Sequence, residues 1–310
     1  MVLHYPTVRT SNWTLLCEAA RTRGIRLVTW EPHRLQVHCR DGGILGCYDG
    51  RPERPGIILH RTVSAFQGIV TPVLKLWTSE GAIVLNEPDA AYRSRDKLLT
   101  YLTLRRARVP IVHTIAFVEP SEEAMQCLAH HRAVILKPAH GVRGEGIRVF
   151  GSTGELLAAW EDDFGQRSLV PFGSLVPLAR EHYVAQPLVG GGGRDVRAFV
   201  VNGTCVALMQ RQAAPGEVRA NLTLGATPTR LPSEHPAAST AVAALEACRL
   251  DYGGVDLIED DDGTVRVLEV DAWAGFAGIS AVTGQDVAGA ILQLALMRRR
   301  GARRGGDTVT

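Results

Sequence analysis

Residues 253–259 (Gly-Gly-Val-Asp-Leu-Ile-Glu) and 264–271 (Thr-Val-Arg-Val-Leu-Glu-Val-Asp) flank an acidic turn, and together they decide the fold. Apolar and polar residues alternate in both segments, and the Asp-Asp-Gly turn between them predicts a β-hairpin. Glu269 and Asp271 are two residues apart, so they share one face of the sheet. Asp256 joins that face if the strand pairing brings its end opposite theirs.

Three carboxylates on one side of a sheet repel one another unless a cation lies among them. Hard oxygen ligands suit Mg²⁺, so Asp256, Glu269 and Asp271 are candidate ligands of a divalent ion. The alternative is a solvated acidic hairpin. A catalytic cluster of metal and carboxylates normally holds a phosphate-bearing substrate, so the upstream chain should provide cations and flexible glycines.

The composition is typical of a soluble globular chain. Its 310 residues are 45% hydrophobic and carry a formal net charge of +2, which is enough core for two or three domains. The sequence contains no long apolar run, and residues 1–6 do not resemble a signal peptide, so we expect a cytoplasmic protein that does not span a membrane. Six cysteines without a Cys-x-x-Cys pair favour reduced thiols over disulfides or a structural zinc.

The first part of the chain alternates helices with strands. Residues 15–23 predict a helix with Ser11 or Asn12 as its N-cap. Apolar runs predict strands at residues 25–30, 56–60 and 82–85. A helix is expected at residues 65–77, between the second and third of these strands. This alternation indicates a parallel sheet in a small α/β domain.

Lysine is rare in this chain, which has only Lys75, Lys97 and Lys137 beside its many arginines. A lysine that persists in such a chain suggests a need for a compact, mobile ammonium group. Lys97 lies near the start of a helix expected over residues 93–108. Lys137 closes a buried strand at residues 133–138.

A glycine-rich stretch follows Lys137 and contains Gly141, Gly144 and Gly146. Glycines let backbone amides approach a polyphosphate closely, and such a loop can fold over the phosphates as a lid. The stretch lacks the Gly-Lys-Ser/Thr of a Walker A loop, and the alternative is an ordinary turn. His140 falls in the same stretch and is a further candidate to contact a nucleotide.

The second half of the chain is dominated by strands, which makes it α+β. An extended apolar run at residues 183–189 leads into glycines. Residues 195–201 and 204–211 predict a hairpin about the turn Asn202-Gly203, and Asp195 and Arg197 then share one face.

In chain order, these motifs resemble those of the ATP-grasp superfamily, and within it the chain is most similar to RimK-type α-L-glutamate ligases and their relative LysX. The motifs are Asp-Lys, Lys-Pro with the glycine-rich stretch, Gln-x-x-Val, Asp-Val-Arg, Arg-x-Asn, Gly-Val-Asp and Glu-Val-Asp, between residues 93 and 290. The resemblance implies an α+β ATP-grasp fold whose two α+β lobes clasp ATP, preceded by an N-terminal α/β pre-ATP-grasp domain. The implied limits are 1–92 for the N-terminal domain, 93–185 and 186–300 for the lobes, and 301–310 for a flexible basic tail.

The resemblance also implies an ATP site. The lysines and the glycine-rich stretch match the family's phosphate contacts, and residues 186–189 match its adenine hinge. Asp195 matches a residue near the ribose, and the Arg-x-Asn pair matches residues near the γ-phosphate and metal. The implied set is Lys97, Lys137, Gly141, Gly144, Gly146, Gln186, Pro187, Leu188, Val189, Asp195, Arg219 and Asn221. Asp256, Glu269 and Asp271 match the ligands of Mg²⁺, with two ions expected and Mn²⁺ as an alternative.

The activity that the resemblance implies is ATP-dependent carboxylate–amine ligation through an acyl phosphate, with glutamate or a related amino acid as one substrate. Arg211 and Arg219 are the candidate catalytic residues, because arginines can hold the transferring phosphoryl group and the later oxyanion. The alternative for both is an ordinary ion pair. Two other functions fit the motifs: a LysX-like ligase acting on a small acidic carrier protein, and an ATP-binding regulator without turnover.

The expected partners are amino acids or peptide-like small molecules, with no nucleic acid and no membrane, and a homo-oligomer is expected.

Three departures from the RimK pattern concern the substrate wall and the hinge. Asp271 replaces the usual Asn and still supplies oxygen, whereas Trp273 and Ala274 replace Ser-Pro beside the acceptor. Pro187 lacks an N–H, so adenine contact there must use carbonyls or the next amide.

Overall fold

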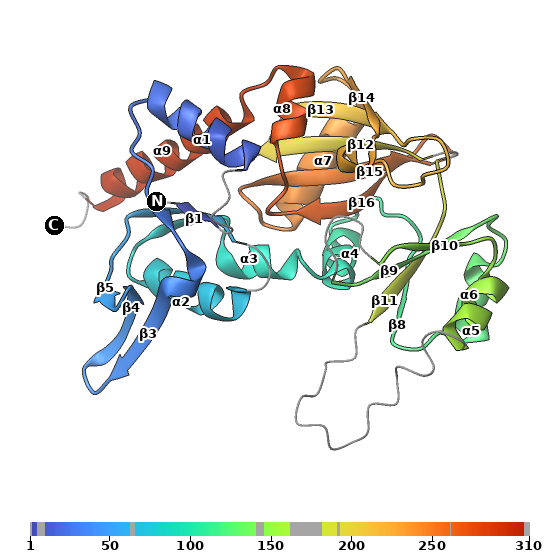
Figure 1. The fold of residues 1–310 in the computed structure, drawn as a ribbon, viewed down its shortest axis with the longest axis horizontal. Helices are drawn as coiled ribbons and strands as arrows, with labels where there is room; N and C mark the ends of the chain where they lie inside the picture. Colours follow the sequence, from blue (N-terminus) through green and yellow to red (C-terminus); the bar gives the residue numbers. More distant parts are fainter. Residues whose placement is uncertain are drawn as a thin grey trace.

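The computed structural model describes residues 2–4, 10–62, 66–140, 146–161, 182–190, 193–260 and 262–306. Figure 1 shows the N-terminal elements at one end of the molecule and two sheet-containing lobes at the other. The mixture of helices and sheets agrees with the fold class expected from the sequence. The domain limits inferred from the motifs stay predictions.

The N-terminal sheet is parallel, as the alternating helices and strands predicted, with the order β2-β1-β6-β7. Its strands are β1 (Val2–His4), β2 (Thr29–Trp30), β6 (Ile57–Arg61) and β7 (Ile83–Leu85). Helix α2 (Gln67–Ser79) buries one face against it, with Val73, Leu74 and Trp77 fully enclosed. Only two residues of the apolar run 25–30 are strand.

A small antiparallel sheet beside α2 was not anticipated. It has the order β3-β4-β5, with β3 (Leu35–Arg40), β4 (Gly43–Tyr48) and β5 (Arg51–Pro52), and it follows the short 3₁₀ helix η1 (Pro32–Arg34). Polar residues and exposed positions interrupt its apolar pattern, so the sequence gives little sign of it. Gly46 packs against Trp77, where a Cβ atom would collide with the indole ring.

The N-cap of helix α1 (Ser11–Thr22) is Thr10, one residue before the first of the two expected caps. The side chain of Thr10 accepts a hydrogen bond from Trp13 N–H at 3.3 Å. The prediction of Ser11 or Asn12 was therefore wrong. The Asn12 side chain caps a different helix, α8 (Ala277–Thr283). Its Oδ1 accepts hydrogen bonds from the amides of Phe276 and Ala277, both at 2.8 Å.

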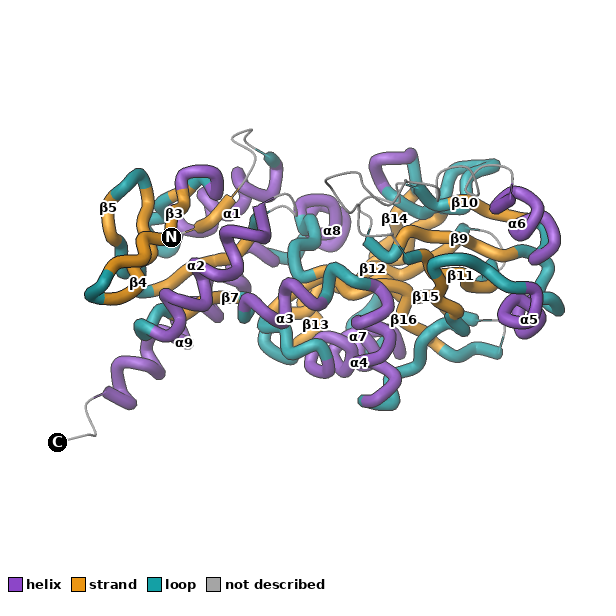
Figure 2. Tube along the Cα trace, turned by 90° about the horizontal axis from the view of Figure 1, so that it is seen from below, coloured by secondary structure: helices purple, strands orange, loops and turns teal. Residues whose placement is uncertain are grey.

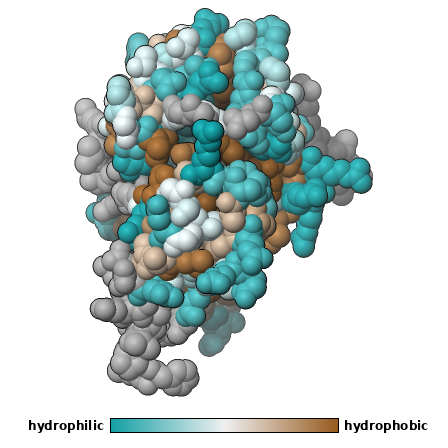
Figure 3. All heavy atoms as spheres, turned by 90° about the vertical axis from the view of Figure 1, so that its right-hand side faces the viewer, coloured by the Kyte–Doolittle hydropathy of each residue, from teal (hydrophilic) through white to brown (hydrophobic). Residues whose placement is uncertain are grey.

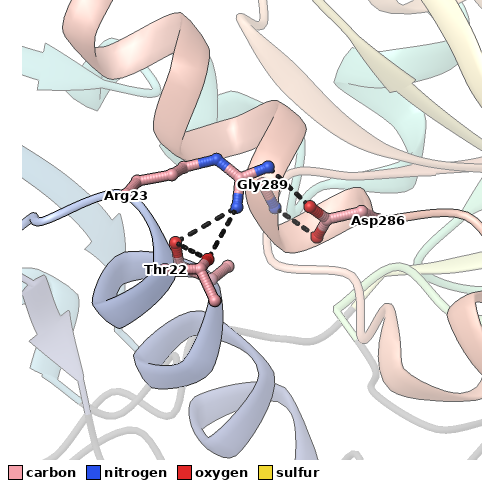
Figure 4. A network of polar contacts seen from close by, with 5 residues as sticks. Thr22, Arg23, Asp286 and Gly289 are labelled. Carbon is pink, nitrogen blue, oxygen red and sulfur yellow. Dashed lines mark hydrogen bonds and ion pairs between the residues drawn. The ribbon is translucent and has the colours of Figure 1, made fainter.

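The C-terminal helix α9 (Val287–Gly306) returns to the N-terminal end of the molecule and packs against α1. Figure 4 shows the polar contacts where α1 ends and α9 begins: Arg23 pairs with Asp286 at 2.6 Å, and Asp286 accepts the amide of Gly289 at 2.8 Å. A side chain at Gly289 would collide with both charged groups. The helix continues through residue 306, past the start of the tail expected at residue 301.

The central lobe contains an antiparallel sheet of order β10-β9-β11-β8. Its strands are β8 (Ile115–Phe117), β9 (Val134–Pro138), β10 (Arg148–Phe150) and β11 (Tyr183–Pro187), and its helices are α5 (Glu122–Met125), η3 (Gln126–Leu128) and α6 (Thr153–Ala159). The helix expected over residues 93–108 is the shorter α4 (Lys97–Arg106), and α3 (Pro88–Arg93) precedes it. They separate because Asp96 is the N-cap of α4.

The C-terminal lobe is built on a five-stranded antiparallel sheet of order β14-β13-β12-β15-β16. Its elements are β12 (Arg194–Val201), β13 (Thr204–Gln212), η5 (Leu222–Leu224), β14 (Thr227–Arg230), α7 (Pro236–Ala247), β15 (Tyr252–Glu259) and β16 (Val265–Asp271). Helix α7 covers one face, while α8 and α9 cover the other. Figure 2 shows this lobe between the N-terminal elements and the central lobe.

Among the described residues, no single helix has the length and apolar character needed to cross a membrane. The pair Ala277–Thr283 and Val287–Ala302 meets the length and composition requirement only jointly, with a bend of 113° between the two helices.

Asn86 joins the N-terminal sheet to the C-terminal lobe. Its side chain is fully buried and makes four hydrogen bonds to that lobe's backbone. Nδ2 donates to the carbonyls of Tyr252 at 2.9 Å and Ala272 at 3.2 Å, and Oδ1 accepts from the amides of Asp251 at 2.7 Å and Tyr252 at 2.9 Å. One side-chain amide therefore satisfies four backbone groups at a largely buried junction.

Replacing Asn86 with alanine should destabilise the protein by about 2–4 kcal/mol, because several buried backbone groups lose their only partner. The free energy of unfolding in urea measures this loss. The control is Gln126→Ala, which removes an exposed amide and should change the free energy by less than about 0.5 kcal/mol. Equal stability of the two variants would contradict the joint role of Asn86.

Candidate active site

A cleft lies between the central and C-terminal lobes and is lined by residues of both. Apolar side chains line part of it, including Ile135, Leu188, Ile258 and Leu268. Figure 3 views the molecule from the side of the central lobe and shows apolar surface between hydrophilic bands. A cleft lined by apolar side chains and a few polar groups suits a small ligand such as a nucleotide.

Two lysines line the cleft, Lys97 on α4, which packs against α7 and β16, and Lys137 on the sheet of the central lobe. Lys97, at the first turn of α4, lies with its Nζ 3.8 Å from Glu269 Oε1 across the cleft. Lys137, on β9, donates a hydrogen bond to Gln186 Oε1 at 2.8 Å. The pKa of Lys137 is lowered to about 8, chiefly by burial; the negative charge of Glu269 opposes the shift and the positive charge of Lys97 adds to it. An ammonium group this poorly solvated gains strongly from an anion placed beside it.

The carboxylates enter from the C-terminal lobe. In the hairpin of β15 and β16, Asp256 pairs directly with Glu269, and Asp271 lies two residues further along β16 opposite Gly254. Burial raises the pKa of Glu269, although its side chain is still 42% exposed within the cleft, and burial also raises the pKa of Asp271. Glu269 and Asp271 are therefore costly to keep ionised, and a bound cation would reduce that cost.

Two arginines lie beneath the carboxylates, and only one was predicted as functional. Arg211, on β13, makes a bidentate contact with Asp195 at 2.7 and 2.6 Å and reaches Asp256 Oδ1 at 3.0 Å. Arg197, on β12, pairs with Asp256 at 2.5 and 3.0 Å. The Asp-Val-Arg spacing indicated the position of Arg197, because it places Arg197 on the same face of the strand as Asp195.

Gly254 makes room for this ion network. A Cβ atom at residue 254 would lie 2.6 Å from the guanidinium of Arg197 and 2.5 Å from the side chain of Ala274. The glycine of the Gly-Val-Asp motif is therefore required for close approach between strands and not for a turn.

Most of the predicted ATP-site residues line one cleft. From the predicted set these are Lys97, Lys137, Gln186, Pro187, Leu188, Val189, Asp195, Arg219, Asn221, Asp256 and Glu269. Asp271, Arg211 and Gly146 are not among its lining residues. Gly141 and Gly144 lie outside the described residues.

The two candidate catalytic arginines have different positions. Arg211 is only 4% exposed, and its guanidinium is occupied by Asp195 and Asp256 behind the cleft wall, so it holds carboxylates in place and does not face a ligand. The two carboxylates raise its pKa against the opposing effect of burial. Arg219 does line the cleft and pairs with Glu217 at 2.7 Å.

The hinge segment differs from the expectation in one respect. The amide of Leu188, the next amide after Pro187, already donates to the carbonyl of Ala133 at 2.9 Å. It is therefore not free to hold a ligand, and polar contacts there are left to carbonyls and to Val189.

The N-terminal domain reaches the end of β16, which sequence reasoning missed. Arg61 donates to the carbonyls of Trp273 at 3.1 Å and Ala274 at 3.0 Å. The ring of His60 packs edge-on against Trp273 with centroids 5.5 Å apart, and burial lowers the pKa of His60 to about 3. A neutral histidine and an indole thus form the wall beside Asp271.

Comparison with known proteins places these features in context. A family model described as "RimK-like ATP-grasp domain" matches residues 94–295. A probable alpha-L-glutamate ligase of Alkalilimnicola ehrlichii is 32% identical over 287 residues, which cover 89% of this chain and 88% of that protein.

Two solved structures share the fold. The ATP-grasp ligase PsnB, complexed with a minimal precursor, Mg and ADP, superposes with a TM-score of 0.70 and 21% identity, covering 96% of this chain and 97% of PsnB. The D-cycloserine synthetase DcsG superposes with a TM-score of 0.69 and 18% identity, covering 96% of this chain and 98% of DcsG. At these identities, the likeness shows a shared fold.

Replacing Arg211 with leucine should destabilise the protein by about 3 kcal/mol at neutral pH, because the carboxylate of Asp195 stays buried without its bidentate partner. The deficit should shrink as the pH falls, because Asp195, whose pKa burial already raises to about 6, then takes up a proton. Urea unfolding at several pH values measures both effects.

The control is the double variant Asp195→Asn/Arg211→Leu, which removes both charges of that pair. It should recover at least about 1 kcal/mol relative to Arg211→Leu. A double variant that is less stable than Arg211→Leu at neutral pH would contradict the coupling.

Proposed function

The chain belongs to the RimK-like ATP-grasp family of ligases, and from that membership we propose that it joins a carboxylate to an amine at the expense of ATP, through an acyl phosphate. Glutamate or a related amino acid is the proposed carboxylate or amine substrate, as the name of the Alkalilimnicola relative suggests. The observation that carries the proposal is the cleft itself. It brings Lys97 and Lys137 together with Asp256 and Glu269 around one cavity.

ATP fits this distribution of charge. The lysines lie where the phosphates would be attracted, and Lys137, with its lowered pKa, gains a partner for its poorly solvated charge. The apolar side chains of Ile135 and Leu188 offer surfaces for the adenine ring. Residues 186–189 are therefore proposed as the adenine hinge, as the motif resemblance implied.

Mg²⁺ fits the carboxylates. Asp256, Glu269 and Asp271 are hard oxygen donors on adjacent strands, and burial raises the pKa of the latter two. The arginine contacts of Asp256 do not exclude a metal, because each carboxylate oxygen has two lone pairs. When bound, the metal would neutralise charge on the phosphoryl oxygens. We expect the site to bind two Mg²⁺ ions, with Mn²⁺ as the alternative metal.

The chemistry then follows from the residues in the cleft. An oxygen of the substrate carboxylate takes the γ-phosphoryl group of ATP, and ADP leaves. The amine then attacks the acyl carbon, so that the C–N bond forms as the C–O bond to phosphate breaks and inorganic phosphate departs. Arg219 and the two lysines hold the transferring group, and Arg211 positions Asp195 and Asp256.

The acceptor lies beside Asp271 in this proposal, where the N-terminal domain contributes to the wall. His60, Arg61 and Trp273 meet there, and all three are partly or fully buried. This wall differs from the Ser-Pro of RimK-type sequences, so we expect a different acceptor. Attachment to a small acidic carrier protein, a cytoplasmic location and homo-oligomer formation remain predictions from the sequence.

The test uses purified protein with ATP, Mg²⁺ and the twenty amino acids, supplied singly and in pairs. We expect ADP release that depends on a particular pair, with glutamate among the active ones. Mass spectrometry should find a product whose mass is the sum of the two substrates less one water. If no amino acid stimulates ADP formation, the proposal of a simple amino acid ligase fails.

Glu269→Ala provides the matched variant in this assay. It should abolish ATP turnover while the protein stays folded, because Glu269 is central to the carboxylate set and faces Lys97. Circular dichroism and the melting temperature check the fold. A variant that hydrolyses ATP at the wild-type rate would contradict the metal assignment.

Nucleotide affinity should fall as the pH rises through about 8, the pKa of Lys137. Below this pH the ammonium is charged and attracts phosphate, and above it the charge is lost. Calorimetric titration of the wild type from about pH 7 to about pH 9.5 should show Kd rising by up to about tenfold per pH unit. Lys137→Arg keeps its charge over this range and should give a flatter profile; identical profiles would contradict the role of Lys137.

A further inference from the structure

Asp96, His140 and His182 come together outside the set of cleft-lining residues. They belong to three segments. Asp96 is the N-cap of α4, His140 lies two residues after the end of β9, and His182 directly precedes β11. One ligand atom from each lies within 4.8 Å of the other two. The proposed ligase chemistry uses none of these three side chains.

Backbone hydrogen bonds hold the three segments together independently of the side chains. The amide of Lys97 donates to the carbonyl of Ala139 at 3.2 Å, and the amide of Ala139 donates to the carbonyl of His182 at 2.9 Å. Asp96 Oδ1 accepts the amide of Leu99 at 3.0 Å, which orients its carboxylate. The cluster is therefore preorganised, with an outer contact that fixes one ligand in place.

The distances within the cluster fit metal ligands better than hydrogen bonds. Asp96 Oδ2 lies 3.4 Å from Nε2 of His140 and 3.4 Å from Nε2 of His182. A charge-assisted N–H···O bond would be about 2.7–2.9 Å. In a tetrahedral site with metal–ligand bonds of about 2.0–2.1 Å, neighbouring ligand atoms lie about 3.3–3.4 Å apart, since a tetrahedron's edge is about 1.6 times its centre-to-corner distance.

One ligand atom is also unsatisfied. Within the described part of the chain, Nε2 of His182 is buried and has no hydrogen-bond partner. A buried nitrogen without a partner costs free energy, which a coordinated ion would recover. Since both histidines direct Nε2 toward the same carboxylate oxygen, the three atoms enclose one position.

We propose that Asp96, His140 and His182 form a binding site for a divalent transition metal ion, separate from the carboxylates of β15 and β16. Two imidazoles and one carboxylate suit Zn²⁺ and its neighbours in the first transition row, whereas Mg²⁺ prefers oxygen ligands alone. Three protein ligands leave a fourth position open, for water or for another group. The side chain of His140 is 49% exposed, so an ion can reach the site from solvent.

The position of the site connects it to the cleft. Asp96 directly precedes Lys97, and the backbone of Lys97 is bonded to Ala139 beside His140. A bound ion would therefore fix the N-terminus of α4 and with it the lysine that faces Glu269. Occupancy of the site should stabilise this part of the molecule whether or not the ligase proposal is correct.

The experiment titrates Zn²⁺ into the metal-free full-length protein by calorimetry, without nucleotide and with saturating Mg²⁺ to occupy the oxygen-rich site. We expect one Zn²⁺ per chain and a rise in melting temperature. His140→Ala, His182→Ala and Asp96→Asn should each weaken binding at least tenfold, because losing even an outer contact of a metal site costs ten- to hundredfold. Asparagine at residue 96 preserves the helix cap.

His113→Ala is the matched control, because His113 is an exposed histidine outside the cluster, and it should bind Zn²⁺ like the wild type. Cobalt substitution gives a second readout: visible absorption bands of four-coordinate Co²⁺ should appear without the near-ultraviolet bands of thiolate ligands, and should disappear in His182→Ala. Absence of binding in the wild type, or equal binding in the wild type and all three ligand variants, would overturn the proposal. None of these measurements involves ATP turnover, so their outcome is independent of the ligase assay.

Discussion

The buried pairing of Asp195 and Asp256 with Arg197 and Arg211 is the interaction on which the site depends. Four charged side chains from three neighbouring strands lie beneath the cleft, where isolated charges would be too costly to bury. Because strand register decides which side chains meet, the pairing of Arg197 with Asp256 also fixes the position of Glu269 on the next strand. The network thus links the order of strands to the distribution of charge in the cleft.

The cleft also depends on how the N-terminal elements attach to the C-terminal lobe. Residues of α1, β6 and β7 share one hydrophobic core with α8 and α9, so the two regions are packed as one unit. Asn86 and Arg61 add hydrogen bonds to backbone groups at the ends of β15 and β16. Because Arg61 contacts the segment just after Asp271, the N-terminal domain takes part in shaping the proposed acceptor wall.

Sequence motifs predicted the site well wherever residues act through their spacing along one strand or hairpin. Glu269 and Asp271 share a face because they are two residues apart. Asp256 lies opposite Glu269 because the pairing shifts by one residue between Asp256 and Leu257, a bulge that the spacing from the turn does not predict. Arg211 was a candidate catalytic residue with an ion pair as the alternative, and in the structure it pairs with Asp195. A register shift between Phe199 and Val200 on β12 brings these two residues opposite each other, and spacing from the Asn202-Gly203 turn does not predict that shift.

The sequence by itself determined the family, the fold class, and the lysines and carboxylates that face one another, because those features lie in short motifs whose local geometry is regular. Only the tertiary structure decided that Asn12 caps α8, that Leu188 has already used its amide, and that Asp96, His140 and His182 converge. Each of these contacts joins residues from separate segments of the chain. Such contacts are decided by how packed elements meet, and no periodicity within a single segment encodes them.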